Sequence, residues 1–151
     1  MDYQNILESC EDPTIGRAVF NALKQLFDRD ATLLIINVSE RTIAAKLAEY
    51  LGPYLPNLDV DVEYNRMGII PKRIMLNTDA DGVYPDIIVH SRMTTNNLLA
   101  IELKKSSNPE PKELDISKLK AYRQQLGYSY ALFIRLGVET SACSIWECEW
   151  V

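Results

Sequence analysis

The alternation of apolar and polar residues between positions 84 and 105 predicts two neighbouring β-strands, Asp86–His90 and Leu98–Lys104. Both segments are rich in Ile, Val and Leu, and a polar stretch with two Asn and two Thr separates them. If they form an antiparallel hairpin that closes between His90 and Leu98, residues whose numbers sum to 188 lie opposite each other. This register sets Asp86 against Glu102.

The second of these strands divides its side chains between a core face and a charged face. Because side chains alternate along a strand, Glu102 and Lys104 point the same way, and the core face carries Leu99, Ile101 and Leu103. Two facing carboxylates repel each other unless a cation lies between them. A hard divalent cation such as Mg²⁺, bound by both carboxylates, would remove this repulsion. A salt-bridged sheet surface is the alternative interpretation of the same residues.

The remaining pattern predicts an α/β order of elements. A helix begins at Asp12-Pro13 and ends near residues 28–30, and the apolar run 31–36 is either a strand or a buried link. A second helix ends near Leu51, before Gly52-Pro53. The alternating segment Asp59–Arg66 is a half-buried strand, with Val60, Val62 and Tyr64 on one face, and 67–84 is a long connection of the kind that often carries function.

After the hairpin, the sequence predicts a helix, a buried strand and a final strand. Asp115 or Ser117 could cap the helix, which ends near Gly127, with Leu119, Tyr122 and Leu126 on its inner side. The buried strand is Tyr130–Leu136, interrupted by Arg135. The last strand is Cys143–Trp150, and its face with Trp146, Cys148 and Trp150 would be a dimer surface if nothing inside the protein covers it.

Glu40 has two interpretations. It follows Asn37 by three residues, which is the spacing of a capping box. It also falls on the apolar stripe of the second helix, where an acidic residue would point toward the sheet. The first interpretation is structural and the second is functional.

Several other polar residues are candidates for the same site. Glu63 could be a third carboxylate, a base that orients water, or a solvated residue. Lys72 and Arg73, together with Arg66, are candidate phosphate contacts or solvated charges. His90 is the only histidine, and it lies about 13 Å from Asp86 along the strand, so a structural or surface role is favoured.

Composition adds limits to this picture. The chain has 151 residues, of which 47% are hydrophobic and 25% charged, as expected for a single globular domain over 1–151. The net charge of −5 disfavours tight nonspecific binding to duplex DNA. The three cysteines have no metal-binding spacing, and we expect a cytoplasmic protein without a signal peptide or membrane span.

Pro85-Asp86 followed by Glu102-Leu103-Lys104 resembles the PD-(D/E)XK nuclease superfamily, which has a restriction-endonuclease-like fold. The order of predicted elements from about 37 to 149 is similar to that family's αβββαβ core, a mixed sheet flanked by helices, here with an extra N-terminal helix. Ser39-Glu40-Arg41 resembles the first helix of Holliday-junction resolvases. Small stand-alone bacterial or phage-type nucleases are the other members that this chain resembles.

The resemblance implies a nuclease that hydrolyses phosphodiester bonds, acting on DNA with Mg²⁺ or Mn²⁺. It implies metal contacts from Asp86, Glu102 and Leu103, a catalytic role for Lys104, and further acidic side chains from Glu40 or Glu63. Lys118 stands where some relatives have a glutamine that lines the site, one turn before a tyrosine, and is a candidate nucleic-acid contact. A homodimer would suit cleavage of two strands. The alternative is an inactive nuclease-fold module that binds a partner protein or nucleic acid.

Overall fold

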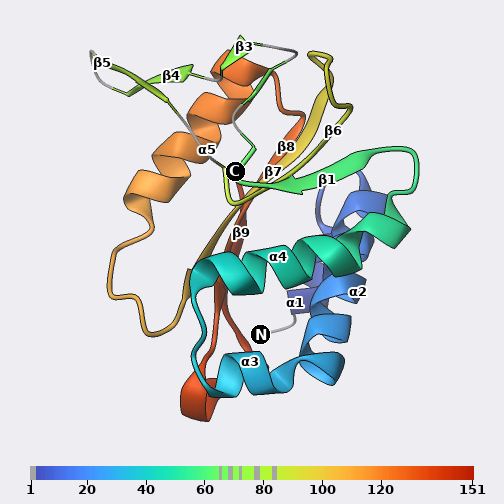
Figure 1. The fold of residues 1–151 in the computed structure, drawn as a ribbon, viewed down its shortest axis with the longest axis vertical. Helices are drawn as coiled ribbons and strands as arrows, with labels where there is room; N and C mark the ends of the chain where they lie inside the picture. The colour runs from blue at the N-terminus through green and yellow to red at the C-terminus, as the bar shows by residue number, and fades with distance from the viewer. Residues whose placement is uncertain (1–2, 65, 68–69, 72, 77–78, 83–84) are drawn as a thin grey trace.

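The protein is an α/β domain built on one five-stranded mixed sheet with helices on both faces (Figure 1). The computed structural model describes residues 3–64, 66–67, 70–71, 73–76, 79–82 and 85–151, and the side chains within residues 65–84 lie outside the description. The sheet order is β1-β6-β7-β8-β9, in which β7 and β8 run parallel and the other neighbours run antiparallel. These strands are β1 (Asp59–Val62), β6 (Ile87–His90), β7 (Asn97–Lys105), β8 (Tyr130–Leu136) and β9 (Ile145–Trp150).

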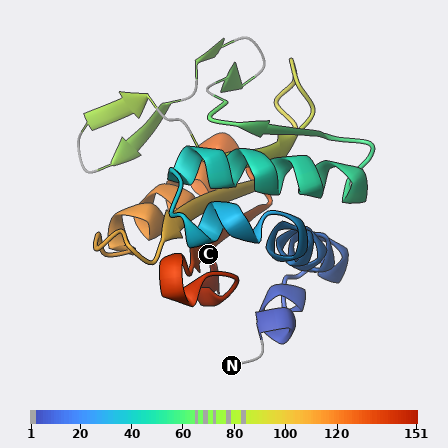
Figure 2. The same cartoon turned by 60° about the horizontal axis from the view of Figure 1, so that its bottom comes forward.

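The N-terminal third of the chain is helical and covers one face of the sheet. Buried residues of these helices form a common core with the sheet residues that include Leu99, Ile101 and Leu103, as the alternation predicted. Figures 1 and 2 both show α4 between β1 and the short helix α3. The helices are α1 (Tyr3–Glu8), α2 (Pro13–Arg29), α3 (Ala31–Ile35) and α4 (Glu40–Leu51), and a 3₁₀ turn, η1 (Gly52–Tyr54), follows α4.

The opposite face of the sheet is covered by α5 (Glu113–Leu126). Leu119, Tyr122 and Leu126 are buried there against Ala100 and Phe133, which confirms the predicted inner side of this helix. The helix ends at Gly127, whose φ of 73° is a left-handed conformation that glycine adopts without strain. A second 3₁₀ turn, η2 (Glu139–Ser141), connects β8 to β9.

The predicted connection over 67–84 contains two short antiparallel ribbons. One pairs β2 (Arg66–Met67) with β3 (Ile70–Pro71), and the other pairs β4 (Arg73–Leu76) with β5 (Asp79–Gly82). Both lie at the periphery, on the far side of α4 from α3 (Figure 2), and β4 lies beside α5. None of the described helices is long and apolar enough to cross a membrane.

The predicted start of α2 is confirmed. Pro13 occupies the first turn, and the carboxylate of Asp12 accepts a hydrogen bond from the backbone N–H of Thr14 at 3.0 Å. The run 31–36, which periodicity could not assign, forms the short helix α3. The N-terminal helix α1 was not predicted.

Both predicted caps after this point were wrong by a few residues. Ser39, and not Asn37, precedes α4, and its hydroxyl accepts the N–H of Thr42 at 3.2 Å. Glu40 is therefore the first residue of the helix, where the capping-box geometry does not apply. The helix α5 begins at Glu113, so Asp115 lies inside its first turn.

Two of the predicted strands also need correction. The first core strand ends at Val62, because Glu63 has a positive φ of 50°, and Tyr64 then packs with the α5 core rather than with Val60 and Val62. In β9 the pairing shifts, so Trp146 is an extra residue that is half exposed while Cys148 and Trp150 pack inward. The indole N–H of Trp150 contacts the carbonyls of Ile6 and Leu7 at 3.2 and 3.1 Å, so α1 covers this end of the face.

Candidate active site

The predicted register of the β6–β7 hairpin is confirmed. Ile87 pairs with Ile101 and Val89 with Leu99, pairs that both sum to 188. The register shifts only at His90, which pairs with Asn97, so that Leu98 is the extra residue. Asp86 directly precedes β6, and this pairing brings its side chain against that of Glu102. The two carboxyl groups are close enough to share a hydrogen bond.

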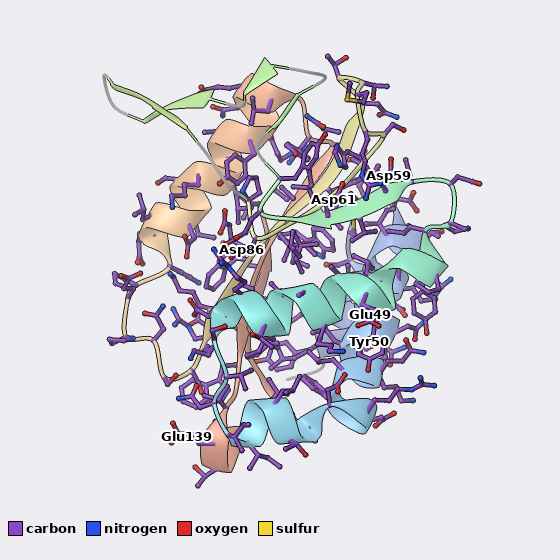
Figure 3. The ribbon with its side chains drawn as sticks, viewed as in Figure 1. Glu49, Tyr50, Asp59, Asp61, Asp86 and Glu139 are labelled. Atoms are coloured by element: carbon purple, nitrogen blue, oxygen red, sulfur yellow. The ribbon has the colours of Figure 1, made fainter. Side chains whose placement is uncertain are left out.

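Asp86 lies where the sheet meets the N-terminal end of α4 (Figure 3). Its Oδ2 atom accepts a hydrogen bond from the backbone N–H of Leu103 at 2.8 Å. Glu102 is 6% exposed, and its Oε1 atom accepts the phenol hydrogen of Tyr122 at 2.8 Å. Both carboxyl groups are thus held in fixed positions by neighbours on β7 and α5.

Burial raises the pKa of both acids. For Glu102 the pKa lies well above the ordinary value, because burial and then the charge of Asp86 disfavour its ionised form. Burial also raises the pKa of Asp86, although the N–H of Leu103 and the hydrogen bond with Glu102 oppose this. Burial, followed by the charge of Glu102, raises the pKa of Tyr122 as well, so that its hydroxyl stays a donor. The two acids therefore titrate as a pair.

Lys104 does not form an ion pair with Asp86 or Glu102. Its ammonium lies 3.1 Å from Asp115 Oδ2 and 3.1 Å from Glu110 Oε2. Burial by itself would lower the pKa of Lys104, but these two carboxylates outweigh it and hold the pKa above its ordinary value. The lysine is therefore a charged group beside the acidic pair.

Glu40 reaches the end of β7. Its Oε2 atom accepts the backbone N–H of Lys105 at 2.7 Å, and the amide of Asn108 lies 3.3–3.4 Å from its two carboxylate oxygens. Its charge contributes, after burial, to the raised pKa of Asp86. Glu40 thus lies next to the acidic pair through tertiary contacts, and its role in chemistry stays a prediction.

Glu63 is placed differently from the other candidates. Its carboxylate forms an ion pair with Arg41 at 2.9 Å, and only its backbone N–H, which donates to the carbonyl of Asp86 at 3.3 Å, touches the site. Its positive φ directs the chain away from the strand alternation that suggested a shared face. The contact that the structure describes for the Glu63 carboxylate is the ion pair with Arg41. A role of Glu63 in the site stays a prediction.

The predicted nucleic-acid contacts are mostly undescribed. Lys72 and the side chains of Arg66 and Arg73 lie outside the described residues. Lys118 is half-buried on the same helical face as Asp115 and Tyr122, and forms no ion pair within the described part of the chain. These four assignments stay predictions.

The buried His90 belongs to a separate network that reaches the surface at Arg92, and its distance from Asp86 along the strand indicated a role outside the site. Its Nε2 atom lies 2.7 Å from Asp61 Oδ2, and its ring meets Tyr64 edge-on at 4.6 Å. Arg92 donates to both oxygens of Asp61 at 2.9 and 2.6 Å, and this is the main reason that the pKa of Asp61 is lowered. Asp61 lies on β1, away from Asp86 (Figure 3). The network joins β1 to β6 and has a structural role.

Sequence reasoning missed two members of the site, Asp115 and Glu110. Asp115 was interpreted as a helix cap, and Glu110 was not singled out. The available signal was Lys104 itself, because a lysine facing inward from a sheet needs acidic partners. The sequence could not indicate which of the many later carboxylates would supply them.

The arrangement fits a divalent cation with few protein ligands. Among the described residues, no three His, Cys, Asp or Glu side chains converge as a ready-made metal site. Asp86 and Glu102 nevertheless form a buried acidic pair without a cationic side chain at ion-pair distance in the described part of the chain. Mg²⁺ keeps several of its waters and takes as few as one or two carboxylates from a protein. Asp86 and Glu102 are thus the described residues that could hold such an ion.

The fold and site define an α/β protein with a mixed five-stranded sheet and a buried acidic pair at the start of a central strand. No family model and no curated protein matches the sequence. Among solved structures, the chain is similar to the crystal structure of SSO0001, with a TM-score of 0.41 and 12% sequence identity. The match covers 89% of this chain and 64% of that one.

Proposed function

We propose that the protein is a metal-dependent nuclease with a restriction-endonuclease-like core, which hydrolyses phosphodiester bonds in DNA. The observation that carries the proposal is the buried pair Asp86–Glu102, with the Lys104 ammonium on the same face of β7. A buried acidic pair is costly for stability, and a divalent cation would relieve its repulsion. This arrangement is what metal-assisted hydrolysis requires.

The order of elements supports the same proposal. From α4 onward the main elements are α4, β1, β6, β7, α5 and β8, which is the αβββαβ order of the family that the sequence resembles. The sheet neighbours β1-β6-β7-β8, with only β7 and β8 parallel, suit such a core. The PD and ExK residues stand at the start of β6 and on β7.

Each residue has a defined part in this proposal. Asp86 and Glu102 would hold Mg²⁺ or Mn²⁺, and the ion would supply Lewis acidity for the attack of water on phosphorus. The backbone of Leu103 fixes Asp86 through its N–H, which donates to the carboxylate at 2.8 Å. Tyr122 orients Glu102, and Lys104 would stabilise the negative charge that develops on the phosphate.

One observation favours the alternative of an inactive binding module. Lys104 is already paired with two carboxylates, so its ammonium is not free to bind a phosphate, and the chain has a net charge of −5. In that case the acidic pair would have no catalytic role, and the protein would bind a partner protein or nucleic acid without cutting it. The two functions differ in whether purified protein cuts DNA.

The test is a cleavage assay with wild type, Asp86→Asn and Lys104→Ala on linear, supercoiled, single-stranded and four-way-junction DNA. We expect cutting with Mg²⁺ or Mn²⁺, none with EDTA, and a loss of about 100-fold or more in each variant. Circular dichroism would establish that the variants are folded, and Glu49→Gln, on the exposed side of α4, is the matched surface control. Equal cutting by wild type and folded Asp86→Asn would refute the assignment, and no cutting by any protein would favour the binding module.

A further inference from the structure

The two carboxylates that hold Lys104 differ in their surroundings. Both lie 3.1 Å from the Nζ atom. The side chain of Asp115 is 8% exposed, whereas that of Glu110 is 72% exposed. One ammonium therefore has one partner in the protein interior and one at the surface.

Asp115 is fixed in place by α5. It lies in the first turn of a helix whose Leu119 and Tyr122 are buried against the sheet. Its Oδ2 atom is buried, and within the described residues the Lys104 ammonium is its partner at ion-pair distance. Moving Asp115 away from Lys104 would require displacement of the helix or would leave a buried charge unpaired.

Glu110 lies on the segment between β7 and α5, and its backbone is anchored separately from its side chain. The guanidinium of Arg135 donates to the carbonyls of Asn108 and Glu110 at 2.9 and 3.0 Å, and the N–H of Glu110 donates to the side-chain oxygen of Asn108 at 3.0 Å. The exposed carboxylate can therefore rotate into solvent without movement of the backbone. Only the Glu110 side of this ion pair is open to solvent, and the Lys104 ammonium keeps Asp115 when Glu110 leaves.

We propose that Asp115 is the positioning residue of Lys104, and that Glu110 occupies, in the free protein, the position beside the Lys104 ammonium that a phosphate oxygen of the substrate takes. This inference rests on the proposed nuclease function. A lysine ammonium has three donors, so it can keep Asp115 while it exchanges one carboxylate oxygen for one phosphate oxygen. The exchange replaces one anionic acceptor by another and breaks no covalent bond.

The two roles predict different kinetic effects for two isosteric substitutions. We expect Asp115→Asn to lower kcat by about tenfold or more, because Lys104 loses the contact that sets its position. Glu110→Gln should keep kcat and lower KM by about two- to fivefold, because the substrate no longer has to displace the solvent-exposed carboxylate of Glu110 from the Lys104 ammonium. Steady-state cleavage of the best substrate with Mg²⁺ measures both constants.

A second measurement does not depend on cleavage. The pH titration of Lys104, followed by the NMR shift of its ¹³Cε carbon in lysine-labelled protein, should move to lower pH in Asp115→Asn, because burial remains while the buried anion is lost. A smaller shift is expected in Glu110→Gln. Asp115→Glu, which restores the charge, should return the titration toward that of wild type without restoring full kcat.

The outcomes separate this inference from the proposed function. A wild-type protein that cuts no DNA refutes the function, and the NMR titration still tests the positioning role. A Lys104 titration that is unchanged in folded Asp115→Asn overturns the role of Asp115. A Glu110→Gln variant that loses as much kcat as Asp115→Asn overturns the assignment of Glu110 as the displaced partner. If Asp115→Asn does not fold, Asp115→Glu and Glu110→Gln carry the comparison.

Discussion

At the scale of single residues, the site combines strong placement with unfavourable electrostatics. Asp86 is fixed by the N–H of Leu103, and Glu102 by the hydroxyl of Tyr122. The same burial that fixes Glu102 raises its pKa. A protein that needed only stability would not keep two acids in this position, because a neutral side chain of the same shape would avoid the repulsion.

Glu102→Gln should therefore stabilise the metal-free protein at neutral pH while it removes metal-dependent activity. The amide can donate to Asp86 and still accept from Tyr122, and the buried charge disappears. Each unit by which the pKa of Glu102 is raised corresponds to about 1.4 kcal/mol in the free energy of unfolding. Urea denaturation in EDTA measures the difference, with exposed Glu49→Gln as the control.

The sign of the pH dependence follows from the raised pKa. Below the ordinary value of 4.5 both the folded and the unfolded state hold the Glu102 proton, so the variant has no electrostatic advantage. As the pH rises from 4.5 toward the raised value, the unfolded wild type releases the proton first, and wild-type stability falls relative to the variant. A Glu102→Gln protein that is less stable than wild type at pH 7 would contradict the repulsive pair.

At the scale of elements, the site depends on how two helices meet one strand. Glu40, the first residue of α4, accepts a hydrogen bond from the backbone N–H of Lys105. Asp115, in the first turn of α5, forms an ion pair with Lys104. Both contacts gather at the end of β7. The packing of α4 and α5 on opposite faces of the sheet therefore decides which acids surround the pair Asp86–Glu102.

The contact between α1 and α2 offers a test of helix packing far from the site. A Cβ atom at Gly16 would lie 1.9 Å from the carbonyl oxygen of Leu7, so Gly16→Ala must push α1 away from α2. We expect a loss of about 1–3 kcal/mol in the free energy of unfolding, measured by urea denaturation.

Gly52→Ala is the matched control for this substitution. Apart from its two chain neighbours, nothing lies within 4 Å of the added Cβ, so the local crowding of that Cβ against Pro53 is its steric cost, and it should destabilise the protein less than Gly16→Ala. Equal destabilisation by both substitutions would show that the close approach of α1 to α2 is not the cause.

At the scale of the whole molecule, the net charge of −5 opposes binding to nucleic acid. Part of this charge comes from the acids of the site itself. A divalent cation would both fill the site and reduce the repulsion between the protein and the phosphate backbone. The proposed substrate and the proposed metal are thus linked by simple electrostatics.

We therefore expect DNA binding to depend on the cation. Binding of a labelled duplex, measured by fluorescence anisotropy, should be about tenfold or more tighter with Ca²⁺ than with EDTA at matched ionic strength. Ca²⁺ takes oxygen ligands like Mg²⁺ and serves to separate binding from cleavage. Asp86→Asn should lose most of this dependence. Equal affinity with Ca²⁺ and EDTA in the wild type would argue against a cation between protein and DNA.

Much of the central sheet could be predicted from the sequence. Strand β8 has the predicted bounds, and the β6–β7 register follows from alternation and the position of the turn. The ends of helices and strands were predicted less accurately. The positive φ of Glu63, the start of α4 at Glu40 and the extra residue Trp146 in β9 all reflect contacts with distant parts of the chain.

The sequence by itself determined the elements of the sheet and the meeting of Asp86 with Glu102, because alternation and hairpin pairing act between residues close in the chain. The tertiary structure alone decided that Asp115 and Glu110 hold Lys104 and that Glu40 holds the N–H of Lys105. Glu40 lies 65 residues from Lys105 along the chain. Such contacts arise from the packing of whole helices on the sheet, which no local pattern of residues encodes.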